Sequence, residues 1–118
     1  LDAFRSSHLE ISAQPTRRLE LGEFFTEVVR LGNGRFGYSP LRYYECTDNG
    51  CNGKWPDSIP NRWGLVHSHP NTDYPSTTDR ETTRRLRIPG VLVTSFRDLW
   101  FYYQDNSGTA FSLLSNQP

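Results

Sequence analysis

Residues 63 to 70 limit the possible folds of this chain more than any other segment. Their sequence is Trp-Gly-Leu-Val-His-Ser-His-Pro, a short apolar stretch that predicts a buried strand and continues directly into two histidines. Residues two apart on an extended chain point to the same face and lie about 6.5 Å apart. His67 and His69 can therefore bind one metal ion, and Pro70 restricts the backbone at the end of the strand.

A third candidate ligand, Asp79, follows ten residues after His69. It belongs to Ser-Thr-Thr-Asp at 76 to 79, at the start of a segment, 77 to 86, that predicts a helix. Three protein ligands leave a fourth tetrahedral position for water, as in catalytic zinc sites. Each feature also has a simpler interpretation: a single histidine is more often a core or surface residue, and 76 to 79 could be a plain helix cap. Their combination favours a metal site, and His8 is interpreted as a surface residue.

The other segments predict an α/β fold, a mixed sheet with helices beside it. Residues 46 to 62 are rich in Gly, Pro, Asn and Asp and predict a long surface loop or insertion. The last three strands should form a meander against the helix at 77 to 86. The expected elements are a helix at 3 to 13, a hairpin of 24 to 31 and 35 to 40 around Gly32-Asn33-Gly34, a strand at 41 to 45, and strands at 91 to 96, 99 to 104 and 109 to 114.

Length and composition predict one soluble domain spanning residues 1–118. No apolar run approaches the roughly 20 residues of a membrane span, and the first residues do not resemble a signal peptide, so no membrane association is expected. The chain contains no Met, and we expect it to be excised from a longer polypeptide. Its 13 basic and 13 acidic residues balance, which makes a nucleic-acid partner unlikely on electrostatic grounds.

Cys46 and Cys51 lie in the loop within Glu-Cys-Thr-Asp-Asn-Gly-Cys-Asn-Gly. Three interpretations are open for them: a loop disulfide, two free thiols, or half of a metal site. A structural zinc site needs further Cys or His ligands nearby, and the neighbouring sequence offers none. A loop disulfide or a pair of free thiols is therefore favoured over a metal site.

The motif residues resemble the JAMM signature of MPN-domain metalloproteases, in which H-x-H-P is followed by S-x-x-D. The resemblance covers residues 19 to 114 and implies an MPN (JAMM)-like fold with cytidine-deaminase-like topology. It also implies that His67, His69 and Asp79 bind one zinc ion per chain. Ser76 would then donate a hydrogen bond to the oxyanion of the tetrahedral intermediate, and an upstream glutamate would act as general acid and base.

The motif spacing and the position of the glutamate need comparison with the family pattern residue by residue, because both differ or are ambiguous in this chain. Six residues, 70 to 75, separate His69 from Ser76, one fewer than the family usually has. Keeping the family spacing would put Arg80 at a ligand position, so a deletion of one residue in the loop is preferred. Glu20, Glu23 and Glu27 all lie near the first strand. The spacing favours Glu23 as the general base, and Glu27, on the same face under strict alternation, is the next candidate.

A narrower resemblance concerns the order of Glu23, the hairpin, Trp63 and the histidine motif. This order is similar to that of compact JAMM-like domains at the C-terminal tips of Rhs-type polymorphic toxins. It implies a toxic effector that is secreted or delivered into a target cell as part of a larger protein, with a cognate immunity protein as a candidate partner. Without such delivery the domain would be cytoplasmic.

The function expected from these residues is that of a zinc-dependent peptidase or isopeptidase. Its substrate would be a protein or peptide with a peptide or ubiquitin-like amide bond, contacted in part by the loop at 46 to 62. Two alternatives stay open: a non-catalytic MPN-like binding module, and a metal-dependent nuclease or deaminase toxin. The neutral charge disfavours a nuclease, and the chain lacks the P-C-x-x-C motif of zinc deaminases.

Overall fold

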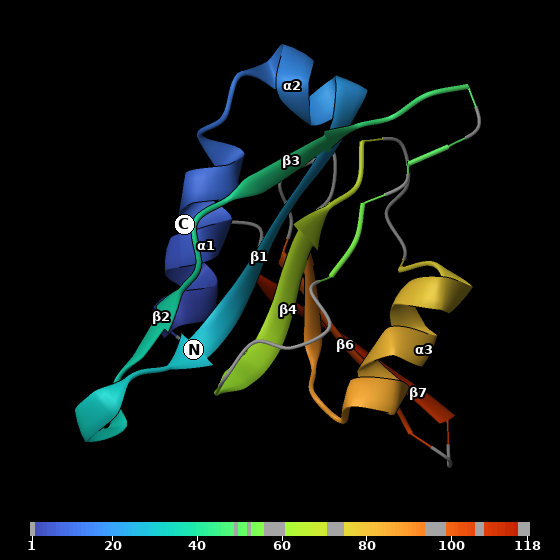
Figure 1. The fold of residues 1–118 in the computed structure, drawn as a ribbon. Helices are drawn as coiled ribbons and strands as arrows, with labels where there is room; N and C mark the ends of the chain where they lie inside the picture. Colours follow the sequence, from blue (N-terminus) through green and yellow to red (C-terminus); the bar gives the residue numbers. More distant parts are fainter. Residues whose placement is uncertain are drawn as a thin grey trace.

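A mixed seven-stranded sheet forms the middle of the computed structural model (Figure 1). The structure describes residues 2–48, 50–51, 53–55, 61–70, 75–93, 99–105 and 108–115. The elements are α1 (Asp2–Ser12), α2 (Thr16–Leu21), β1 (Gly22–Arg30), η1 (Gly32–Gly34), β2 (Phe36–Tyr38), β3 (Arg42–Glu45), β4 (Arg62–Ser68), α3 (Thr77–Leu86), β5 (Gly90–Val93), β6 (Leu99–Asp105) and β7 (Gly108–Ser115).

The strands follow the order β2-β1-β4-β5-β6-β7, and β3 also pairs with β1. β1 and β4 are antiparallel neighbours, with Phe25 opposite His67. β4 and β5 form a parallel pair, and α3 lies between them in the sequence. β5, β6 and β7 form an antiparallel meander. The expected mixed sheet with flanking helices is therefore confirmed as a mixed α and β fold.

The two faces of the sheet carry different side chains, because strand residues alternate between them. Phe24 and Val28 of β1 belong to the apolar core beneath α1, whereas Glu23 and Phe25 lie on the opposite face. Figure 1 shows α1 and α3 on opposite sides of the sheet. The buried core cluster consists of Ala3, Ile11, Phe24, Val28, Val66, Val91 and Val93. Burying each of the larger of these side chains contributes about 1.5 to 3 kcal/mol.

Most of the predicted elements agree with the structure. The hairpin is confirmed, and its connection is a short 3-10 turn in which Asn33 and Gly34 adopt positive φ values of 64° and 72°. Asn and Gly tolerate this conformation better than other residues. The helix at 77 to 86 and a strand at 42 to 45 are confirmed. The predicted strand at 91 to 96 is confirmed to Val93, and 94 to 98 lie outside the described residues.

Two features of the N-terminal part differ from the sequence predictions. The helix α2 was not predicted: Pro15 closes the first helix, but its φ of −53° also suits the start of a second one. The interpretation of His8 as a surface residue was wrong, since it is only 3% exposed. Ala3, Ser7 and Ile11 recur every four residues on the buried side of α1, and His8 lies next to Ser7 on the same side.

The buried ion pair between Glu27 and Arg42 provides a stability prediction. The Glu27 side chain is fully buried and accepts hydrogen bonds from both terminal nitrogens of Arg42 and from Ser39. Arg42→Ala would leave a buried carboxylate without its counter-charge, so we expect a loss of about 3 kcal/mol in the free energy of unfolding. Urea denaturation measures it, with the exposed Arg35→Ala as the control, expected within about 0.5 kcal/mol of wild type. A loss no larger than that of the control would contradict this account.

Candidate metal centre

The two motif histidines converge at the end of β4. His67 is the penultimate residue of the strand, and His69 follows its last residue, Ser68. Both side chains are buried, with exposed fractions of 1% and 7%. Their Nε2 atoms lie 2.9 Å apart. The alternation of an extended chain therefore brings the two imidazoles together, as the sequence predicts.

Asp79 is fixed by the start of α3. Ser76 is the N-cap residue: its Oγ accepts a hydrogen bond from the Asp79 N–H at 3.0 Å, and Asp79 Oδ2 accepts one from the Ser76 N–H at 2.9 Å. This reciprocal pair is a capping box. The same Oδ2 lies 3.1 Å from His67 Nε2 and 3.0 Å from His69 Nε2. The helix cap therefore orients the carboxylate toward the histidines, so both interpretations of residues 76 to 79 apply together.

His67 Nε2, His69 Nε2 and Asp79 Oδ2 form a nearly equilateral triangle, with sides of 2.9 to 3.1 Å. These three residues form a group that could hold a metal ion. Burial by itself would raise the pKa of Asp79, but the charges and hydrogen bonds of the two histidines outweigh it and hold this pKa well below its usual range. Asp79 is therefore an anion that can neutralise part of the charge of a bound cation.

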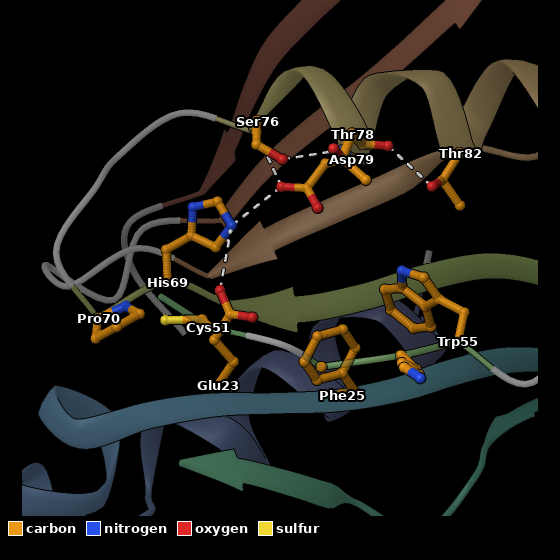
Figure 2. A pocket seen from close by; sticks show the side chains of 12 residues that line it. Glu23, Phe25, Cys51, Trp55, His69, Pro70, Ser76, Thr78, Asp79 and Thr82 are labelled. Atoms are coloured by element: carbon orange, nitrogen blue, oxygen red, sulfur yellow. Dashed lines mark hydrogen bonds and ion pairs between the residues drawn. The ribbon is translucent and has the colours of Figure 1, made fainter. Parts of the chain in front are cut away.

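Glu23 reaches the same point from β1. β1 and β4 are antiparallel and Phe25 pairs with His67, so Glu23, two residues before Phe25, lies level with His69. Its Oε2 is 3.6 Å from His69 Nε2, and Figure 2 shows Glu23 and Asp79 approaching His69 from different elements. Burial raises the pKa of the Glu23 carboxyl to about 7; His69 opposes this rise and the charge of Asp79 adds to it. Such a group can accept and release a proton near neutral pH.

The other two glutamates considered from the sequence are not part of this group. Glu27 does point to the same face as Glu23, but it is engaged by Arg42 and Ser39. Glu20 lies in α2 and is exposed. The structure therefore brings Glu23, and neither of the alternatives, to the histidines.

A cleft of about 600 Å³ opens over these residues. Phe25 and Trp55 form an aromatic wall, with ring centroids 4.8 Å apart, and Trp55 also lies edge-on to His67 at 5.8 Å. Figure 2 shows this wall across the cleft from α3. The lining residues are Glu23, Phe25, Cys51, Gly53, Lys54, Trp55, His69, Pro70, Ser76, Thr78, Asp79 and Thr82.

The described part of the loop at 46 to 62 contributes one side of the cleft. Cys46 and Cys51 form a disulfide, which decides among the three interpretations of these cysteines. Gly53 packs against Phe25 so closely that an added Cβ would lie 2.2 Å from the Phe25 ring. The loop is thus held against the sheet beside the candidate metal centre, where the sequence predicted a substrate contact.

Three aromatic residues at the site, Phe25, Trp55 and Tyr102, were not identified from the sequence. Trp55 belongs to a loop without periodicity, so no pattern indicates its direction. Tyr102 of β6 is fully buried, and its pKa is raised well above the usual value by burial and by the charges of Asp79 and Glu23. The alternation of β6 could have shown that Tyr102 faces the same side of the sheet as Trp100, but not that it lies beside the metal ligands.

Comparisons with protein-family models, with curated proteins and with solved structures find no match. Among the described residues, no helix has the length and apolar character needed to span a membrane.

Proposed function

We propose that this domain is a zinc-dependent peptidase or isopeptidase. The observation that carries the proposal is the convergence of four side chains from three separate parts of the fold: Glu23 from β1, His67 and His69 from the end of β4, and Asp79 from α3. Glu23, His69 and Asp79 line one cleft, and His67 is buried beside them. Three of these are suitable metal ligands, and the fourth is a buried carboxylate next to them.

The donor set suits zinc. Ligand atoms that bind one zinc ion at about 2.0 to 2.2 Å in a tetrahedral arrangement lie about 3.3 to 3.6 Å apart. The observed separations of 2.9 to 3.1 Å are only slightly shorter. Two neutral imidazoles and one carboxylate are the ligand types of catalytic zinc sites, which keep one position open. The residues present therefore fit the ion that the sequence resemblance implies.

When bound, zinc would lower the pKa of a coordinated water toward about 7 and polarise an amide carbonyl. Glu23 supplies the proton transfer: Oε2 accepts a proton from the attacking water and passes it to the leaving amine nitrogen. In the metal-free protein, burial raises the pKa of Glu23 to about 7. Phe25 and Trp55 line the same cleft as Glu23 and present apolar rings to it.

Ser76 is suited to bind the oxyanion. Its Oγ accepts a hydrogen bond from the Asp79 N–H, which leaves the hydroxyl hydrogen available to donate into the cleft that Ser76 lines. A donor directed at the developing negative charge of a tetrahedral intermediate contributes about 3 to 4 kcal/mol to catalysis in enzymes of this kind.

The order of elements supports an MPN (JAMM)-like fold as part of the proposal. A glutamate strand, β1, precedes the motif strand, β4; the motif helix, α3, follows; and further strands complete the sheet. The substrate would be a peptide or a ubiquitin-like tail extended through the cleft.

Delivery as the effector tip of a polymorphic toxin is part of the same proposal. The disulfide between Cys46 and Cys51 supports it, because disulfides form and persist mainly in oxidising compartments outside the cytosol. A cognate immunity protein would then be the partner that covers the cleft. Mass spectrometry of the intact protein, with and without reductant, tests whether the disulfide is present after secretion.

The function is tested by incubating the zinc-loaded domain with a proteome-derived peptide library and with lysine-linked diubiquitin. Mass spectrometry of new termini should show cleavage that depends on zinc and on Glu23. The metal-free protein is the control. A domain that binds zinc but cleaves neither substrate would favour the non-catalytic binding module.

Substitution of Ser76 separates its two roles. Ser76→Ala removes the helix cap, so we expect a loss of about 1 kcal/mol in the free energy of unfolding together with a fall in kcat of about 100-fold. Ser76→Asp is the matched variant, because Asp caps helices as well as Ser does but has no hydrogen to donate when it is ionised. It should unfold like the wild type in urea and still lose kcat. If Ser76→Asp retains full kcat, Ser76 only caps the helix.

A further inference from the structure

The hydroxyl of Tyr102 is buried without an assigned role. The Tyr102 side chain has no exposed surface, and its Oη has no hydrogen-bond partner within the described part of the chain. A buried polar group left without a partner costs about 1 to 3 kcal/mol, and such groups in folded proteins often have a functional reason. The surroundings of Tyr102 indicate what that reason is.

Tyr102 reaches across the sheet toward His67. It pairs with Gly90 on the neighbouring strand β5, and a Cβ added at Gly90 would lie 2.3 Å from Cζ and 2.5 Å from Oη of Tyr102. The Tyr102 ring therefore lies directly over Gly90, where any other residue would block it. β4 is the next strand beyond β5, and the ring centroids of Tyr102 and His67 are 6.2 Å apart and nearly perpendicular.

One ring nitrogen of His67 is also buried without a hydrogen-bond partner among the described residues. Its Nε2 faces His69 and Asp79, whereas Nδ1 is buried without a hydrogen-bond partner among the described residues. When Nε2 of a histidine binds a metal, Nδ1 carries the ring hydrogen and almost always donates it to an acceptor, which fixes the ring orientation and strengthens the ligand. A tyrosine hydroxyl can accept such a bond.

We propose that Tyr102 is the positioning residue of the metal centre: its Oη accepts a hydrogen bond from His67 Nδ1–H, directly or through one water, when a metal ion occupies Nε2. This inference rests on the proposed metal site. It explains together the unpartnered hydroxyl, the unpartnered imidazole nitrogen and the glycine at position 90. Tyr102 acts through His67 and does not contact the substrate.

Tyr102→Phe tests the proposal, because a positioning role and a purely structural role predict different changes. We expect the affinity for Zn²⁺ to fall about 10- to 100-fold. The free energy of unfolding of the metal-free protein should be unchanged or higher, since the variant removes a buried hydroxyl that has no partner. Competition with a chromophoric chelator measures the affinity, and urea denaturation measures the stability.

Tyr43→Phe is the matched control. The Tyr43 hydroxyl donates a hydrogen bond to the Arg18 carbonyl, away from the metal centre. Its loss should reduce stability by about 1 kcal/mol or less and leave zinc affinity unchanged. As a second measurement that needs no variant, NMR of the zinc-loaded wild type should detect a His67 Nδ1–H signal protected from solvent exchange.

The outcomes distinguish this inference from the proposed function. If the wild type binds zinc and Tyr102→Phe binds it equally tightly, the role of Tyr102 is overturned and the metal site stands. A rapidly exchanging Nδ1–H in the zinc-loaded wild type would overturn it as well. If the wild type binds no zinc, both proposals fail.

Discussion

The wild-type domain is expected to purify with one zinc ion per chain, and Asp79→Asn and His67→Ala are expected to purify without it. Asp79 supplies the only carboxylate oxygen within 3.1 Å of both histidine Nε2 atoms in the described structure. Loss of an outer partner of a metal ligand costs about 10- to 100-fold in affinity, so loss of a ligand should cost more. Elemental analysis after purification without chelators measures the stoichiometry, and hydrolysis should fall with it.

Asp48→Ala is the control for this experiment. Asp48 is an exposed acid in the turn after β3, and its removal should leave the zinc content unchanged. Asp79→Asn retains an oxygen that can accept the hydrogen bond from the Ser76 N–H, so a change in zinc content cannot be attributed to loss of the helix. A wild-type protein without metal, or an Asp79→Asn variant with full zinc content, would refute the metal centre.

Glu23→Gln should keep the zinc ion and lose hydrolysis. Gln preserves the shape of the side chain but cannot accept a proton from water and return it to the leaving group. Removing a general acid and base typically lowers the rate about 100- to 10,000-fold. Elemental analysis and kcat, measured on the same preparation, test this combination. Loss of zinc together with activity would instead make Glu23 a ligand.

The pH dependence of stability gives an independent test of the environment of Glu23. Its pKa rises from 4.5 to about 7 in the folded, metal-free protein. Between these pH values the folded protein retains a proton that the unfolded chain releases, so stability falls as the pH rises. We expect metal-free Glu23→Gln to gain stability relative to wild type over this range, by about 3 kcal/mol in total. Urea denaturation at about pH 4 and pH 8 should show that the difference in free energy of unfolding between Glu23→Gln and wild type is larger at the higher pH.

Glu27→Gln is the matched control for both measurements on Glu23. Glu27 lies on the same strand and the same face but pairs with Arg42. The Glu27→Gln variant should be less stable and should retain kcat. If it loses kcat while Glu23→Gln retains it, the assignment of the general base is wrong.

Local patterns were enough to predict much of the site. The extended chain places His67 and His69 on one face, because alternate residues of a strand share a face whatever surrounds them. The S-x-x-D pattern fixed the start of α3 for a similar reason, since a capping box satisfies the free N–H groups of the first turn from within four residues. These interactions join residues that are close together in the sequence, so they can be inferred without knowing the rest of the fold.

The spacing in the sequence favoured Glu23 over Glu27 but did not exclude Glu27. Both are on one face of β1, and only the pairing with other strands separates them. The register of β1 against β4 brings Glu23 level with His69, and β3 supplies Arg42 to Glu27. Strand register depends on contacts between segments far apart in the sequence, and no local pattern in β1 records it.

The sequence by itself determined the ligand types, their spacing and the mixed sheet, because strand alternation, helix capping and turn residues act over a few neighbouring positions. Only the tertiary structure decided which glutamate lies beside the candidate metal ligands, that the disulfide-linked loop forms a wall of the cleft, and that Tyr102 lies over Gly90 beside His67. Each of these features depends on side chains from segments far apart in the sequence that pack together. Such contacts form only when the whole chain is folded, so no local pattern predicts them.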